Sequence, residues 1–232
     1  MSGEVIRTKN FVADAAGFIV RQARNALEAR GEFRIALSGG NTPRPVFREV
    51  ARLGSDIPWR NVVFTFGDER CVPPDDEQSN YRMARESLFD PADVPAESVL
   101  RMRGEIDPAT AAGEYEENLN RLARKRNEKL YQHDLILLGV GDDGHTASLF
   151  PGTDALEIKD HSVVANFVPK FNAWRLTMTL PIINHARVVC FLVNAAKNPE
   201  LIQRIIQGDL QYPAARVKPA SGNLIWILGE AA

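Results

Sequence analysis

Residues 134–152 read DLILLGVGDDGHTASLFPG and decide the fold class. The apolar run that opens the segment is typical of a buried strand, and the glycines after it let a loop approach a ligand closely. We expect Gly139, Gly141 and Gly144 to take positive φ, and the residues after His145 to enter a helix. In open α/β sheets, ligands bind at such strand ends. Since histidine ordinarily titrates near neutrality and a flanking carboxylate can orient its ring, His145 is the first candidate for a general base.

The same loop contains the literal pattern G-x-G-x-x-G over residues 139–144, which raises the alternative of a dinucleotide site. A pyrophosphate bound at a helix N-terminus needs positive potential, and the carboxylates of Asp142 and Asp143 would lie beside it. The fingerprint also usually opens the first strand–helix unit, whereas this loop lies past the middle of the chain. We therefore reject the nucleotide interpretation.

Length and composition narrow the class of protein. The 232 residues contain no long linker, so we expect a single domain over 1–232. A net charge of −2 gives no general attraction to nucleic acid or to an anionic membrane. Cys71 and Cys190 lie far apart, which makes zinc and a disulfide framework unlikely and predicts free, buried thiols. No leader-like segment and no run of about 18 apolar residues occurs, so we expect no membrane span and a cytoplasmic location.

Hydrophobic periodicity predicts alternating helices and strands. Gly31 is placed to end the first helix, and Thr42 to cap the second, with Pro43 at its first position. The alternation predicts a three-layer α/β/α fold with a Rossmann-like, mainly parallel sheet covered by helices on both faces, in which the late strands are candidates for an antiparallel edge. The expected helices are 11–30, 43–53, 79–89, 109–130 and 199–207, and the expected strands are 33–37, 62–66, 134–138, 163–167, 175–180, 188–193 and 224–228.

Residues 38–42, Ser-Gly-Gly-Asn-Thr, lie between a predicted strand and a predicted helix. Amide donors, two hydroxyl side chains and the positive end of the helix dipole converge there, so a phosphate would fit. The pattern is not a Walker P-loop and implies no nucleoside triphosphate. A capped tight turn without a ligand explains the same residues equally well.

Asp68, Glu69 and Arg70 place three charges in a loop at the end of another predicted strand. An arginine there can bind a phosphate or a developing oxyanion, and the alternative is a surface ion pair of little energetic value. Arg175 and Lys197 lie near the ends of later strands, from which they could reach the same sheet edge. We expect structural roles for the remaining histidines, His133, His161 and His185.

The residues that several common catalytic mechanisms require are absent from the sequence. The chain has no G-x-S-x-G elbow, no H-E-x-x-H pattern and no cysteine in a nucleophile setting. A metal site built from Asp142, Asp143 and His145 would lack further ligands, so we expect no bound metal. The groups that remain suit water attack on an activated carbonyl of a phosphorylated metabolite.

Taken together, these motifs resemble the 6-phosphogluconolactonases of the oxidative pentose phosphate pathway, and the resemblance covers nearly the whole chain. The string GHTASLFPG, residues 144–152, is its most specific part. The other matching segments are 37–43, 68–70, 79–80, 138–143, 175–177, Lys197 and 210–217.

The resemblance implies hydrolysis of 6-phospho-D-glucono-1,5-lactone to 6-phosphogluconate without metal or organic cofactor. His145 would take a proton from the attacking water, Asp143 would hold its surroundings, and Arg70 would face the lactone or the phosphate. Asp68 and Glu69 would support these groups. The partner implied is a small phosphorylated sugar lactone, and the chain would be a monomer or a weak homo-oligomer. The expected phosphate ligands are Ser38, Gly39, Gly40, Thr42, Arg175 and Lys197.

Two alternatives remain. The aminosugar-6-phosphate isomerase/deaminases share the fold and the phosphate loop, but they place a carboxylate soon after the Gly-His pair, where this chain has the uncharged residues 147–151. The other alternative is a non-catalytic sugar-phosphate sensor. The intact set of His145, Asp143 and Arg70 argues against a sensor, which has no use for a base.

Overall fold

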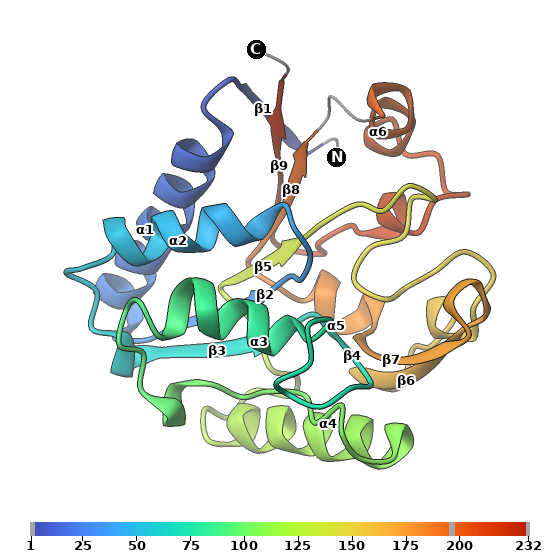
Figure 1. Ribbon diagram of the computed structural model, residues 1–232, viewed down its shortest axis with the longest axis horizontal. Helices are drawn as coiled ribbons and strands as arrows, with labels where there is room; N and C mark the ends of the chain where they lie inside the picture. Colours follow the sequence, from blue (N-terminus) through green and yellow to red (C-terminus); the bar gives the residue numbers. More distant parts are fainter. Residues whose placement is uncertain (1–2, 195–197, 231–232) are drawn as a thin grey trace.

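A six-stranded parallel sheet organises the protein (Figure 1). The computed structural model describes residues 3–194 and 198–230. The strands follow the order β1-β9-β8-β5-β2-β3, and each neighbouring pair is parallel. Their bounds are β1 Glu4–Thr8, β2 Phe33–Leu37, β3 Val62–Phe66, β5 Leu135–Leu138, β8 Val188–Asn194 and β9 Asn223–Gly229.

Helices cover both faces of this sheet, as the sequence predicts. On one face, α1 (Phe11–Arg30) and α2 (Pro43–Leu53) lie side by side, next to α3 (Asn80–Ala84) and the π-helical turn η2 (Arg85–Phe89). The other face carries α4 (Pro108–Arg124), α5 (Leu180–Asn184) and α6 (Pro199–Ile206). Every residue of β2 and β5 is buried, because both of their faces are covered.

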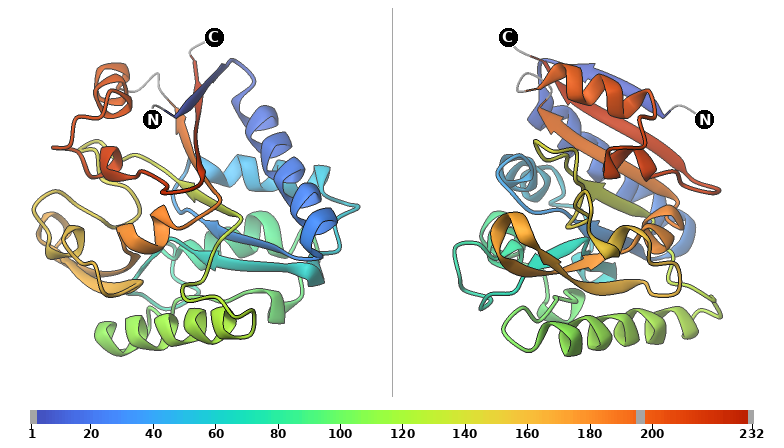
Figure 2. Two further views of the ribbon diagram at one scale, coloured as in Figure 1. Left: turned by 180° about the vertical axis from the view of Figure 1, so that it is seen from behind. Right: turned by 90° about the vertical axis from the view of Figure 1, so that its right-hand side faces the viewer.

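The antiparallel strands expected late in the chain are present, but they form a second, smaller sheet and do not extend the edge of the main sheet. This sheet has the order β4-β7-β6, with β4 at Asp68–Arg70, β6 at Val163–Val168 and β7 at Ala173–Met178. Figure 2 shows α4 running beneath it. Residues 68–70, expected in a loop, instead pair with β7, because a short charged strand can join a sheet edge without an apolar pattern of its own.

Other local predictions also need correction. The helix expected over 109–130 ends at Arg124, since the chain turns at Asn127, which has a left-handed φ of 57°. The strand expected over 175–180 is displaced to 173–178 and is followed by α5. β1 was not predicted, because an edge strand that is mostly exposed carries little apolar pattern. Gly31 does end α1, with a φ of 72°.

No helix within residues 3–194 and 198–230 is both long enough and apolar enough to span a bilayer.

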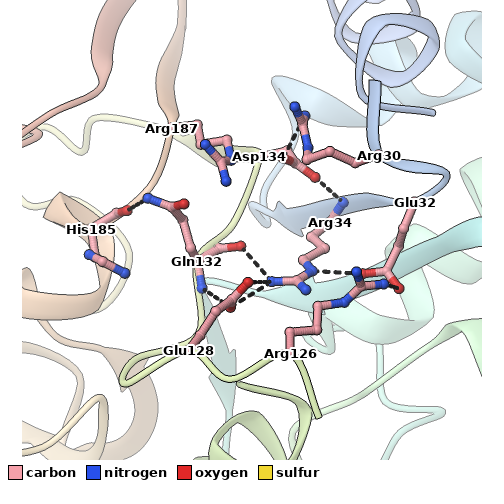
Figure 3. A network of polar contacts seen from close by, with 9 residues as sticks. All are labelled: Arg30, Glu32, Arg34, Arg126, Glu128, Gln132, Asp134, His185 and Arg187. Atoms are coloured by element: carbon pink, nitrogen blue, oxygen red, sulfur yellow. Dashed lines mark hydrogen bonds and ion pairs between the residues drawn. The ribbon is translucent and has the colours of Figure 1, made fainter. Parts of the chain in front are cut away.

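A network of ion pairs joins four segments at the amino-terminal edge of the main sheet (Figure 3). The Arg34 guanidinium, on β2, donates to Glu32 at 2.6 Å and to Glu128 at 2.8 Å. Asp134, just before β5, accepts the backbone N–H of Arg34 at 2.9 Å and contacts the arginines at 30 and 187 at 2.8 and 3.3 Å. The buried Asp134 carboxylate therefore ties β2 to the end of α1 and to the start of β8.

We expect Asp134→Ala to lower the free energy of unfolding by about 2 kcal/mol, because a buried N–H loses a charged acceptor. Urea denaturation measures this loss. Asp134→Asn retains an oxygen for the Arg34 N–H and should be less destabilising. Equal stability of the alanine variant and the wild type would show that the Asp134 carboxylate does not stabilise the fold.

His133 lies beside this network and is fully buried. One ring nitrogen, Nε2, lies 3.0 Å from the Thr65 hydroxyl, while Nδ1 has no hydrogen-bond partner in the described part of the chain. Burial, with smaller contributions from Arg34 and His185, lowers the pKa of His133 to about 3. The imidazole is therefore neutral in the folded protein at neutral pH.

This depressed pKa predicts acid sensitivity. Below about pH 6.5 the unfolded chain binds a proton at His133 that the folded protein refuses until about pH 3. The free energy of unfolding should fall by up to about 1.4 kcal/mol per pH unit across that window. The free energy of unfolding of His133→Gln, measured between pH 4 and 8, should lack this fall with decreasing pH. His185→Gln is the control. An unchanged slope in His133→Gln would refute the prediction.

Candidate active site

A cavity of about 470 Å³ opens at the carboxyl ends of β2, β3 and β5. The chain leaves β2 toward the face that carries α2 and leaves β5 toward the opposite face, so their loops diverge and leave a crevice between them. The lining comes from these loops and from the small sheet: Ser38, Gly39, Gly40, Asn41, Thr42, Pro43, Asp68, Arg70, Gln78, Gly139, Val140, Gly141, His145, Ala147, Ser148, Phe150, Phe171 and Arg175.

The loop after β2, residues 38–42, is a tight turn that depends on two glycines. Gly39 packs so closely on Asn80 that a Cβ would lie 1.8 Å from the Asn80 Oδ1, and Gly40 has a φ of 95°. Both positions thus require glycine. Thr42 is the N-cap residue of α2 and Pro43 its first residue, as predicted, but the Thr42 side chain makes no capping hydrogen bond and lines the cavity instead.

The two acidic residues of β4 have different surroundings. Glu69 is only 2% exposed, and its carboxylate accepts the backbone N–H groups of Asn80 and Tyr81 at 2.7 and 2.8 Å. Burial raises its pKa, although these backbone hydrogen bonds act in the opposite direction. Glu69 thus anchors the first turn of α3. Asp68 lines the cavity and accepts the Ser148 hydroxyl at 2.6 Å.

Two arginines lie opposite each other in the small sheet. Arg70 on β4 is the register partner of Arg175 on β7, and both line the cavity. Burial and then the neighbouring Arg70 lower the pKa of Arg175. Neither guanidinium has a carboxylate oxygen within 4.0 Å among the described residues, and Arg70 donates instead to the Gln78 carbonyl. Two adjacent cations without acidic partners favour an anionic ligand, and the alternative of a surface ion pair at Arg70 is not observed.

The His145 ring is held on three sides. Its Nδ1 lies 2.5 Å from the Asp143 Oδ1, and the ring stacks on Phe150 with centroids 4.0 Å apart. The third side is Gly141, where a Cβ would lie 2.0 Å from the ring Cε1. The predicted positive φ occurs at Gly144 but not at the two earlier glycines.

The helix expected after His145 does not form. Residues 146–152 form successive turns, in which Ala147 takes a left-handed φ of 48°. The Thr146 hydroxyl donates back to the Gly139 carbonyl at 2.9 Å, which closes the loop on itself.

The charge on Asp143 decides which nitrogen of His145 can act as a base. Burial works to raise the pKa of Asp143, but hydrogen bonds from Lys170 and His145 outweigh it and lower the pKa to about 2. An ionised carboxylate only accepts hydrogen bonds, so Nδ1 carries a hydrogen, and in the neutral imidazole Nε2 is then the nitrogen with the lone pair. A base with its acceptor nitrogen available is the arrangement that proton abstraction from water needs.

Comparison with known proteins assigns the family. A family model described as glucosamine-6-phosphate isomerases/6-phosphogluconolactonase matches residues 7–226. The chain belongs to this family. A 6-phosphogluconolactonase from Nostoc sp. is 38% identical over 225 residues, which cover 95% of this chain and 92% of the relative. One from Synechocystis sp. is 40% identical over 218 residues, or 92% and 89% of the two chains.

Solved structures agree with the family assignment. The crystal structure of 6-phosphogluconolactonase from Thermotoga maritima has a TM-score of 0.85 and 28% identity, and the match covers 98% of this chain and 99% of that one. The α/β fold and the family resemblance predicted from the sequence are therefore confirmed.

Most of the predicted site residues meet in one cavity, and some functional candidates were missed. Lys197 lies outside the described residues. Lys170 and Phe171 were not proposed, because 27 residues separate Lys170 from the Asp143 carboxylate that it contacts at 2.7 Å and no local pattern links them. The only feature of the sequence that could have indicated a role for Lys170 was its charge, in the turn before Arg175.

Neither the cysteines nor the acidic residues add a further reactive site in the described part of the chain. Cys190 is buried as predicted, but Cys71 is only half-buried, and burial raises its pKa to about 11. Within the described ranges, no three His, Cys, Asp or Glu side chains are grouped so that they could hold a metal ion.

Gly141 offers a direct test of the ring position. We expect Gly141→Ala to push the His145 ring off Phe150 and to lower turnover by about 100-fold, since small displacements of a catalytic group are costly. Gly113→Ala, where an added Cβ meets no atom within 4 Å, is the matched control. Steady-state rates measure the effect, and wild-type turnover in Gly141→Ala would exclude the steric argument.

Proposed function

We propose that this protein hydrolyses 6-phospho-D-glucono-1,5-lactone to 6-phosphogluconate in the oxidative pentose phosphate pathway. The observation that carries the proposal is the juxtaposition, in one cavity, of the His145–Asp143 pair and the two arginines without acidic partners. A base and an anion site together suit a phosphorylated substrate with a reactive carbonyl. Relatives named 6-phosphogluconolactonase that align over most of the chain support it.

The phosphate site that we propose combines the loop after β2 with the small sheet. The loop lies at the N-terminal end of α2, where the helix dipole favours an anion, and Arg175 faces the same cavity. Lys197 belongs to the proposal on the strength of the sequence resemblance alone. The proposed ligands are Ser38, Gly39, Gly40, Thr42, Arg175 and Lys197.

In the proposed reaction a water molecule attacks the lactone carbonyl carbon while His145 Nε2 takes one of its protons. Asp143 stabilises the imidazolium that forms, and Arg70 is placed to stabilise the oxyanion of the tetrahedral intermediate. The bond between this carbon and the ring oxygen then breaks, the imidazolium returns its proton to that oxygen, and the new carboxylic acid ionises. No covalent enzyme intermediate forms.

The alternatives are less well supported. An aminosugar-6-phosphate isomerase/deaminase would need a carboxylate in the turn after His145, where Ala147, Ser148 and Phe150 line the cavity. A non-catalytic sensor would gain nothing from an oriented base.

The remaining expectations from the sequence form part of the same proposal. They are a single domain over 1–232, a cytoplasmic location, no nucleic-acid or membrane partner, and a monomer or weak homo-oligomer. A net charge of −2 supports the absence of a polyanionic partner.

The test is the rate of lactone loss with enzyme against the spontaneous rate, with the lactone generated in situ. We expect clear acceleration by the wild type and at least about a 100-fold fall in turnover for His145→Ala, since the base is lost. Circular dichroism checks that the variant is folded. The control is His161→Ala, which removes an exposed histidine.

No acceleration by the wild type would contradict the proposed function, and ammonia release from glucosamine 6-phosphate would then identify the deaminase. Unchanged activity of His145→Ala would contradict its role as the base.

A further inference from the structure

The turn between β6 and β7 places Lys170 against Asp143, in the loop that carries His145. The turn is the short 3-10 helix η5 (Pro169–Phe171), closed by Asn172 in a left-handed conformation with a φ of 46°. The Asn172 N–H donates to the Pro169 carbonyl at 3.1 Å, and the strands pair in register up to Val168 and Ala173. The backbone of Lys170 is therefore fixed by hydrogen bonds within the hairpin.

Each oxygen of the Asp143 carboxylate has its own partner. Oδ2 accepts the Lys170 ammonium at 2.7 Å, while Oδ1 accepts the ring Nδ1 of His145 at 2.5 Å and its backbone N–H at 3.2 Å. Because both oxygens are engaged, the carboxylate cannot rotate without breaking one of these contacts. The orientation of the carboxylate in turn selects the hydrogen on Nδ1 and leaves Nε2 as the acceptor.

A second contact path connects the same turn to the base. Phe171, the residue after Lys170, packs edge-on against Phe150 with centroids 5.6 Å apart, and Phe150 stacks on His145. Phe171 lines the cavity, whereas Lys170 does not. The Lys170 ammonium therefore contacts Asp143 from outside the cavity.

We propose that Lys170 is a positioning residue that holds Asp143, and through it the reactive tautomer and orientation of His145. The inference deepens the proposed lactonase function and rests on it. Lys170 is 51% exposed, and exposed ion pairs contribute little to stability, so its role is in the geometry of the base.

The proposal has a defined pH signature. Removing the Lys170 cation takes a like charge away from the imidazolium that forms during turnover, so protonation of the base becomes easier. The acid limb of the pH–rate profile should move to higher pH. Besides His145, the charged side chains that line the cavity among the described residues are Asp68, Arg70 and Arg175, and Tyr212 packs on Gly144 behind the loop; none of these changes in a Lys170 variant.

The experiment compares Lys170→Met, Lys170→Arg and the wild type in the lactone assay from pH 5.5 to 8.5. We expect Lys170→Met to lower kcat about tenfold with KM nearly unchanged and to shift the acid limb upward, because the base is misaligned but the cavity is intact. Lys170→Arg should recover most of kcat. Lys159→Met, at an exposed lysine outside the cavity, is the matched control.

A spectroscopic readout is independent of turnover. Long-range ¹H–¹⁵N correlation of the imidazole rings, assigned with His145→Ala, should show hydrogen on Nδ1 in the wild type. In Lys170→Met it should show a mixture of tautomers.

Three outcomes would overturn the inference: wild-type kcat in Lys170→Met, a rise in KM that accounts for the whole loss, or an unchanged tautomer. Failure of the proposed function is distinguishable from these outcomes, since it appears as no acceleration by the wild type itself.

Discussion

The parallel pairing of β2 with β5 at the centre of the sheet places the loop of residues 38–42 beside the loop that carries His145. Ile35 is the register partner of Leu135, so the two strands end at the same edge and their loops leave side by side. One loop turns toward the face with α1 and α2, and the other turns toward the face with α4 and the small sheet. Since the chain cannot fill the space where these paths diverge, a crevice is a consequence of the topology.

The small sheet brings charge to that crevice at an electrostatic cost. Arg70 and Arg175 face each other across β4 and β7 without a carboxylate within ion-pair distance in the described ranges, and the pKa of Arg175 is lowered by burial and by its neighbour. Glu69 directs its charge away from them into the amide groups at the start of α3. Among the described residues that line the cavity, the two arginines outnumber Asp68, which favours an anionic ligand, while the Glu69 carboxylate holds the strand–helix corner.

Rigidity around His145 comes from many small constraints. The absence of a Cβ at position 141 lets the ring approach the loop backbone, and the stack on Phe150 and the hydrogen bond to Asp143 hold it there. Such preorganisation reduces the reorganisation that a proton transfer requires, which is where an enzyme acting on an already reactive lactone gains rate. The same constraints explain why a residue outside the cavity, Lys170, can affect the base.

The sequence by itself determined the order and type of most elements and the positions of the glycine loops, and it singled out His145 as the candidate base, because these depend on local periodicity and on residue chemistry at strand ends. Helix α1, with its glycine stop, and the buried strands β2 and β5 needed no information from distant residues. Only the tertiary structure decided that Arg70 and Arg175 are neighbours, that 68–70 is a strand, and that Lys170 reaches Asp143. These contacts join segments that are tens of residues apart, and strand register between such segments is set by the packing of the whole sheet, which no local pattern encodes.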